Sequence, residues 1–182
     1  MVEDQDPALV RACQAGDTRA FETLVDRYLK TILNVVQRMV KNHDDAEDIT
    51  QTVFIKVYEN LQGIDLRQKF FSWLYRIAVN EALNFIRRQK RTTRLEGDFA
   101  ANGSTPEEAF VETEFNDQIQ DSLMKLDPEN RGLIVLKHLQ NCSYQEMAYI
   151  MDIPEKTVKS RLYSARQLLK GILVQSGIFE NE

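Results

Sequence analysis

Apolar side chains recur along most of the chain at steps of three and four residues, which is the spacing of one face of an α-helix. The longest such stripe begins at Phe21, after Asp17, and predicts a helix of about 24 residues that ends near Asn42. A shorter helix precedes it, with Asp6-Pro7 at its start and Gly16 at its end. The first part of the chain is therefore predicted to be a helical hairpin.

Two further helices are predicted before the middle of the chain. Asp44 and Glu47 resemble a capping box, which predicts a helix from there to a stop at Gly63. The next helix is predicted from Phe70 to Arg91, and it becomes strongly basic toward its C-terminal end. The stretch from Thr92 to Thr105 contains glycines and no apolar period, so we expect a flexible linker there.

Helix signals resume after this stretch. Thr105-Pro106 and Asp127-Pro128 each place a capping residue before a first-turn proline. Ser143 and Glu146 form a capping box for a short helix, and the turn 151–154 separates it from a longer one. The β-branched residues follow helical rather than alternating spacing, so no strand is predicted. The predicted fold class is all-α, with two small helical domains joined by a flexible linker.

Length and composition agree with this reading and exclude several classes of protein. A chain of 182 residues with 43% hydrophobic content can bury a core in each of two small domains. No apolar run approaches the roughly 20 residues of a membrane span, and the acidic start is unlike a signal peptide, so a cytoplasmic protein without membrane insertion is expected. Cys13 and Cys142 lie far apart, and neither His43 nor His138 has a ligand partner at metal spacing.

The same residues argue against an enzyme. The sequence has no phosphate-cradling glycine loop and no plausible Ser/His/Asp or Cys/His arrangement. We therefore predict no catalytic residue, no cofactor and no metal site.

The net charge of −5 conceals a very uneven distribution of charge. Residues 67–94 carry eight basic side chains against the single acid Glu81, and residues 156–170 carry five bases and no acid. Between them, residues 95–131 carry ten acids and two bases. Two basic patches separated by an acidic connector suit a protein that contacts an anionic polymer at two places.

The helix after residue 154 has the surface chemistry of a DNA-recognition helix. Val158, Leu162, Ala165 and Leu169 form one apolar stripe, which leaves lysines, arginines and hydroxyls on the other faces. Long cations can contact phosphates or guanine edges, and short hydroxyls allow close approach to the major groove. The alternative is a solvated cationic face on an ordinary helical hairpin, and the pattern alone leaves both open.

Three runs of sequence carry a family resemblance. They are Ser143-Tyr144-Gln145-Glu146-Met147-Ala148 followed by Thr157-Val158-Lys159-Ser160-Arg161-Leu162 and Ala165-Arg166; Asp45-Ala46-Glu47-Asp48-Ile49 with Gln51 and Phe54; and Trp73-Leu74-Tyr75-Arg76-Ile77-Ala78 with Asn80. The first resembles region four of bacterial RNA polymerase sigma factors, and the others resemble the polymerase-binding and promoter-melting helices of region two. The order and the short linker resemble the extracytoplasmic-function (ECF) group.

The resemblance implies a function and a set of domains. It implies a protein that binds core RNA polymerase, reads the minus-thirty-five and minus-ten elements of promoter DNA and helps to melt the duplex. Residues 1–92 would form region two, 93–105 the linker and 106–182 region four. A regulatory partner, an anti-sigma factor, is also implied.

The resemblance also assigns residues to these tasks. The minus-thirty-five set is Lys137, Tyr144, Gln145, Thr157, Lys159, Ser160, Arg161, Tyr163, Ser164 and Arg166. The minus-ten set is Arg76, Asn80, Asn84, Arg87 and Arg88, with the loop from Gln62 to Lys69 receiving an extruded base. The polymerase-binding set is Asp45, Glu47, Asp48, Gln51 and Phe54.

Two alternatives remain on the residues alone. A helix-turn-helix regulator acting without polymerase would bind duplex DNA by itself, usually as a dimer on paired half-sites. A helical protein-interaction adaptor would account for the amphipathic helices and the acidic stretch, but it leaves the two basic patches unexplained. The acids at 45–48 would also favour a helix N-terminus whatever they bind.

Overall fold

The computed structural model describes residues 6–65, 69–96 and 112–178 of the chain. Within these ranges the backbone is mostly helical and contains no strand, as the sequence predicts. In chain order the elements are α1 (Asp6–Gln14), α2 (Thr18–Val40), α3 (His43–Asn60), the 3-10 turn η2 (Leu61–Gly63), α4 (Phe70–Glu96), α5 (Glu112–Met124), α6 (Pro128–His138), α7 (Tyr144–Met151) and α8 (Glu155–Gln175). No helix in these ranges is both long and apolar enough to span a bilayer.

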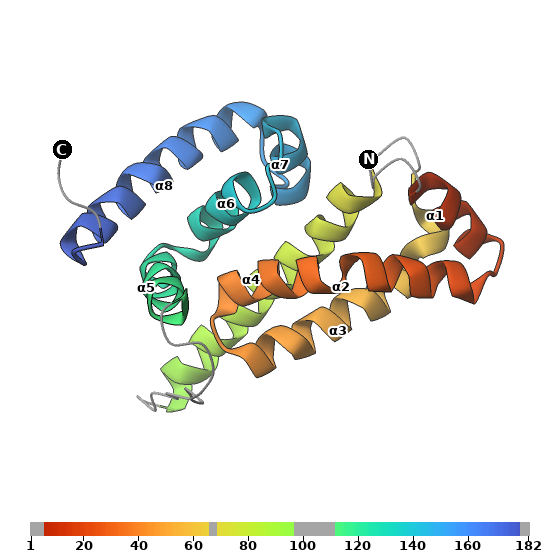
Figure 1. Cartoon of the computed structure of the whole chain (residues 1–182), viewed down its shortest axis with the longest axis horizontal. Helices are drawn as coiled ribbons and strands as arrows, with labels where there is room; N and C mark the ends of the chain where they lie inside the picture. Colours follow the sequence, from red (N-terminus) through yellow and green to blue (C-terminus); the bar gives the residue numbers. More distant parts are fainter. Residues whose placement is uncertain (1–5, 66–68, 97–111, 179–182) are drawn as a thin grey trace.

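Helices α1–α4 form the first unit, in which α2, α3 and α4 pack against one another (Figure 1). The predicted stripe of α2 faces the core of this unit, where Leu24, Ile32 and Val36 are buried. Val53 of α3 and Leu74 of α4 are fully buried in the same core. Because burying such a side chain stabilises the fold by roughly 2 kcal/mol, the apolar stripes determine which face of each helix turns inward.

Asp6 links α1 to α2 through hydrogen bonds to its side chain. Its carboxylate is buried and accepts a 2.5 Å hydrogen bond from Nη1 of Arg27 and a second hydrogen bond from the hydroxyl of Tyr28. Burial, and then the bond to Asp6, raise the pKa of Tyr28 well above its usual range, so the phenol stays a donor. The short first helix is therefore held by a buried polar cluster as well as by apolar contacts.

Two predicted helix boundaries need correction. The predicted capping box at Asp44 is wrong, because Asn42 caps α3 by accepting a 2.9 Å bond from the backbone N–H of Asp45. The predicted end of α4 at Arg91 is also too early, since the helix continues to Glu96. No glycine or proline follows Phe70 before Gly97, so nothing in the sequence stops the helix sooner.

Helices α5–α8 form the second unit, and here the predicted caps are confirmed. Asp127 accepts a bond from the N–H of Asn130 at the start of α6, and Ser143 and Glu146 make both bonds of the capping box on α7. The turn between α7 and α8 contains Asp152 in the left-handed conformation, with φ of 55°. Helices α7 and α8 thus form a helix-turn-helix. The predicted linker is helical as far as Glu96, and the rest of it, like the predicted helix start at Thr105, lies outside the described residues.

The two units pack directly against each other, α7 and α6 against α4, and α5 and α6 against α2 (Figure 1). Arg131 of α6 is buried and takes part in this contact. Its guanidinium donates to the carbonyl of Met39 in α2 and to three carbonyls of its own unit. Gln120 of α5 donates a 3.0 Å bond to the carbonyl of Gln37. The second unit therefore donates to carbonyls in the last turn of α2, where the Gln37 carbonyl also accepts from the N–H of Lys41.

Candidate nucleic-acid interface

Helix α8 turns the predicted apolar stripe inward and its polar faces outward. Val158, Leu162 and Ala165 are buried, whereas Lys159 and Tyr163 are exposed. This burial is the arrangement that a recognition helix needs, since the residues that could reach a DNA groove remain accessible.

Lys137, Tyr144 and Lys159 are brought together from three helices. The Nζ atoms of Lys137 and Lys159 lie 5.2 and 5.4 Å from the centre of the Tyr144 ring. Lys137 also donates a 3.1 Å bond to the carbonyl of Cys142, and Lys159 pairs with Glu155 at 2.6 Å. The hydrogen bond and charge of Glu155 raise the pKa of Lys159, so this side chain keeps its positive charge.

The other predicted minus-thirty-five residues fall into two groups. Gln145, Ser160, Arg161 and Ser164 are exposed, and Thr157 is half-buried. Arg166 lies apart, because its Nε donates a 3.2 Å bond to Nε2 of His138. Burial, followed by the charges of Arg166 and Lys137, lowers the pKa of His138, which keeps the ring neutral and able to accept this bond.

The predicted minus-ten residues lie along one side of α4. Asn80 and Arg88 are exposed and Asn84 is half-buried. Arg76 and Arg87, however, contact the second unit: Arg76 pairs with Asp152 and Arg87 with Glu129, each at 3.1 Å.

The predicted polymerase-binding residues start α3, and the structure separates them by exposure. Glu47, Asp48 and Gln51 are exposed, and Asp45 is half-buried. Burial, then the nearby Asp48 and Asp44, raise the pKa of Asp45. Phe54 does not share this surface, because it is only 8% exposed and belongs to the core.

Two apolar residues of α3 that sequence reasoning missed do share this surface. Ile55 is 58% exposed and Tyr58 is 60% exposed. The signal was present, since Asp48, Gln51, Ile55 and Tyr58 follow one another at helical spacing on the side away from the apolar stripe. A charged and apolar stripe of this kind is typical of a protein-docking surface.

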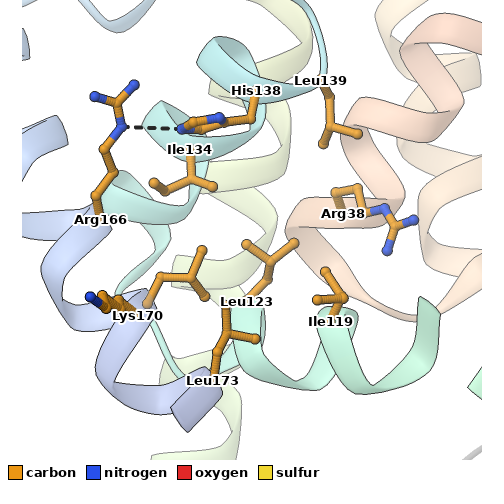
Figure 2. Close-up of a pocket in the computed structure, with 10 residues that line it drawn as sticks. Arg38, Ile119, Leu123, Ile134, His138, Leu139, Arg166, Lys170 and Leu173 are labelled. Carbon is orange, nitrogen blue, oxygen red and sulfur yellow. Dashed lines mark hydrogen bonds between the residues drawn. The ribbon is translucent and has the colours of Figure 1, made fainter. Parts of the chain in front are cut away.

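A cavity of about 810 Å³ lies between α5, α6 and α8 (Figure 2). Its walls are aliphatic, formed by Ile119, Leu123, Ile134, Leu139, Leu169 and Leu173. The remaining lining residues are Arg38, His138, Arg166 and Lys170, so none of the ten residues is acidic. An apolar groove edged with cations suits an amphipathic ligand that carries negative charge.

These features together define a class of protein. A helix-turn-helix that presents cations and hydroxyls, joined to a second unit with a basic helix, is the arrangement of a DNA-binding transcription protein.

Comparison with known proteins places the chain within this class. The family profile Sigma-70 region 2 matches residues 24–92, and Sigma-70, region 4 matches residues 116–169. The ECF RNA polymerase sigma factor SigW of Bacillus subtilis is 36% identical over 173 residues, covering 88% of this chain and 92% of that protein. The chain belongs to the ECF family of RNA polymerase sigma factors, and it directs promoter-specific initiation of transcription.

Solved structures agree with this fold. CnrH in complex with the cytosolic domain of CnrY has a TM-score of 0.72 and 26% identity, covering 92% of this chain and 96% of that one. The sigma factor RpoE of Bartonella quintana, in complex with the anti-sigma factor NepR, has a TM-score of 0.69 and 24% identity, covering 84% of this chain and 96% of that one. At this identity, the likeness to RpoE is evidence for the fold alone.

Proposed function

We propose that this sigma factor binds core RNA polymerase through α3, reads the minus-thirty-five element with α7 and α8, and binds the separated minus-ten strand with α4. The work is binding rather than catalysis, and it takes place in the cytoplasm. The observation that carries the proposal is the division of exposed polar residues among three separate helical surfaces of one chain.

The minus-thirty-five surface is formed by the N-terminal halves of α7 and α8, together with Lys137 of α6. Lys137 and Lys159 would hold phosphates on either side of Tyr144, while Gln145 and Ser160 would face base edges. The helix N-termini add a partial positive charge at the same place. Arg166 would bind backbone phosphate only after leaving His138.

The minus-ten surface is the side of α4 that carries Arg76, Asn80, Asn84, Arg87 and Arg88. Asparagine amides can hydrogen-bond the edges of unpaired bases, and arginines can bind phosphates or stack on bases. No bond is made or broken in opening a duplex by capturing its bases, so these side chains suffice without a cofactor.

The polymerase-docking surface is formed by Asp45, Glu47, Asp48 and Gln51, together with the exposed residues Ile55 and Tyr58. The acids would orient the protein on a basic partner, and the apolar pair would supply desolvated contact area.

The groove between α5, α6 and α8 would receive an anti-sigma partner. Its aliphatic walls and cationic edges fit an amphipathic helix with acidic flanks. The similar protein CnrH forms a complex with the cytosolic domain of CnrY, which supports a protein partner for this chain as well.

Run-off transcription tests the proposal. Purified bacterial core polymerase would be mixed with this protein and a promoter library that reports the selected minus-thirty-five and minus-ten sequences. We expect transcripts only when both proteins are present, and a loss of at least about tenfold for Lys159→Ala, whose side chain would contact the DNA. The matched control is Lys30→Ala, which removes an exposed lysine of α2.

A failure to transcribe any promoter, together with a failure to bind core polymerase, would contradict the proposal. Tight binding of the protein alone to duplex DNA would then favour a regulator that acts without polymerase.

A further inference from the structure

The second unit contacts the strand-binding face proposed above, and it also contacts Lys69, which immediately precedes α4. Lys69 pairs with Glu146 at 2.9 Å, Arg76 with Asp152 at 3.1 Å and Arg87 with Glu129 at 3.1 Å. In each of these pairs the cation lies on α4 or immediately before it, and the acid belongs to α5–α8 or their connecting turns. We call Glu129, Glu146, Tyr149 and Asp152 the acidic face.

Arg76 shows how closely the acidic face reproduces the chemistry of a nucleotide. Its guanidinium pairs with the Asp152 carboxylate, lies 5.0 Å from the centre of the Tyr149 ring, and donates a 3.0 Å bond to the Tyr149 carbonyl. A single-stranded nucleotide offers the same three partners, which are an anion, an aromatic plane and a carbonyl acceptor. The two ligands would therefore compete for one guanidinium.

A separate set of contacts holds the units in this arrangement. Arg131 and Gln120 bond the terminal carbonyls of α2, and Lys41 pairs with Asp121 at 2.6 Å. None of these contacts involves α4. We call this packing of the two units the closed arrangement. It can be stabilised or weakened at the end of α2, and the effect on DNA binding can then be measured at α4.

We propose that the acidic face is an internal competitor of the minus-ten strand, so that α4 binds either region four or single-stranded DNA. This inference rests on the proposed function of α4. In the free chain Arg76 and Arg87 of the strand-binding face are engaged by the acidic face, and they become available to DNA only when the second unit moves away. Because the three ion pairs are partly exposed, each is weak and sensitive to salt.

The first test removes the charges of the acidic face in the full-length chain. The variant E129Q/E146Q/D152N keeps side-chain shape, and glutamine at 146 can still serve the capping box. Its affinity for a fluorescein-labelled pool of random single-stranded DNA of about ten nucleotides is expected to rise about tenfold, from three weak ion pairs. The variant E22Q/D26N/E59Q makes the same change in net charge at exposed acids of α2 and α3, and it controls for general electrostatics.

The second test closes the chain permanently. In K41C/D121C a short bismaleimide cross-linker would join α2 to α5, while the native Cys13 and Cys142 are buried. Cross-linking is expected to reduce single-strand affinity at least about tenfold relative to the same variant left unlinked. The reason is that it lowers the fraction of molecules in which the second unit has moved away from α4. An unchanged affinity in the cross-linked chain, or equal affinities in the two amide variants, would overturn the competition.

A third variant separates this inference from the proposed function on which it rests. Adding Arg76→Gln to E129Q/E146Q/D152N should remove most of the gained single-strand affinity. If the amide variant gains affinity but Arg76→Gln leaves it unchanged, the strand binds elsewhere, and both the minus-ten assignment and the competition at Arg76 are wrong.

Discussion

At the scale of single residues, Arg131 links the two units through several buried hydrogen bonds. Its buried guanidinium donates to the carbonyls of Leu123, Met124, Leu126 and Met39, and burial lowers its pKa. Such a buried cation stabilises the fold mainly through its hydrogen bonds rather than its charge, because removing it leaves the buried carbonyls without a donor.

We therefore predict that Arg131→Met lowers the free energy of unfolding by about 3 kcal/mol. Urea unfolding followed by circular dichroism would measure it. Arg161→Met, which truncates an exposed arginine of α8, is the control and should change stability by less than about 0.5 kcal/mol. Equal effects of the two substitutions would show that the buried bonds contribute nothing.

The surface of α3 that we propose for docking also shows the limit of residue-level reasoning. The sequence motif includes both Phe54 and exposed polar residues, but a motif does not say which face of the helix is buried. Packing turns Phe54 into the core and leaves Ile55 outside. Residues one step apart differ by about 100° around a helix, so this single step decides which of them a partner can touch.

We predict that Ile55→Glu weakens binding to core polymerase at least about tenfold, since it places a charge in the centre of an apolar contact. Fluorescence anisotropy of the labelled protein would measure the affinity, and thermal unfolding should be nearly unchanged. Leu168→Glu, at a 53% exposed leucine of α8, is the matched control. Equal losses in both variants would count against a docking surface on α3.

At the scale of elements, the N-terminus of α7 joins local and tertiary structure. Glu146 accepts a 2.8 Å bond from the N–H of Ser143 and a 2.9 Å bond from Lys69. Burial alone would raise the pKa of Glu146, but these two partners lower it below its usual value. The same carboxylate therefore caps a helix of the second unit and contacts the first.

Because the pKa of Glu146 is lowered in the folded state, its contribution to the free energy of unfolding depends on pH. Its stabilising contribution is present above the ordinary glutamate pKa of about 4.3 and is lost as pH falls through the lowered value in the folded state. We predict that Glu146→Gln, measured by urea unfolding between neutral and acid pH, loses less stability on acidification than the unmodified chain does.

Glu146→Ala is the companion variant, because alanine removes the cap that glutamine retains. It should cost about 1 kcal/mol more than Glu146→Gln at neutral pH. If the two variants unfold alike at every pH, the cap made by residue 146 contributes nothing to stability; if both also unfold like the unmodified chain, neither does the ion pair with Lys69.

At the scale of the whole molecule, the two units pack against each other, and this packing bears on which helix surfaces a partner can reach. The contacts at the end of α2 and along α4 set two units against each other with buried apolar residues and weak, exposed ion pairs between them. Such an interface can be stable in the free chain and still yield to a large partner, because the ion pairs exchange readily with other charges.

The sequence alone determined the local structure of this protein. Helix class, most of the helix bounds, the caps at Asp17, Asp127 and Ser143, and the helix-turn-helix follow from apolar spacing and from side chains that bond their own backbone neighbours. These interactions join residues a few positions apart, so they can be read from the order of the residues. The family motifs added the expectation of which helix performs which task.

Only the tertiary structure decided how the two units meet. Met39 and Arg131 are 92 residues apart, and nothing in the sequence around either one indicates the other. The same holds for Arg76 with Asp152, for the groove edged by cations, and for the exposure of Ile55 rather than Phe54. Each depends on which surfaces of already-formed helices come together, and that is settled by shape and packing over the whole molecule rather than by any local pattern.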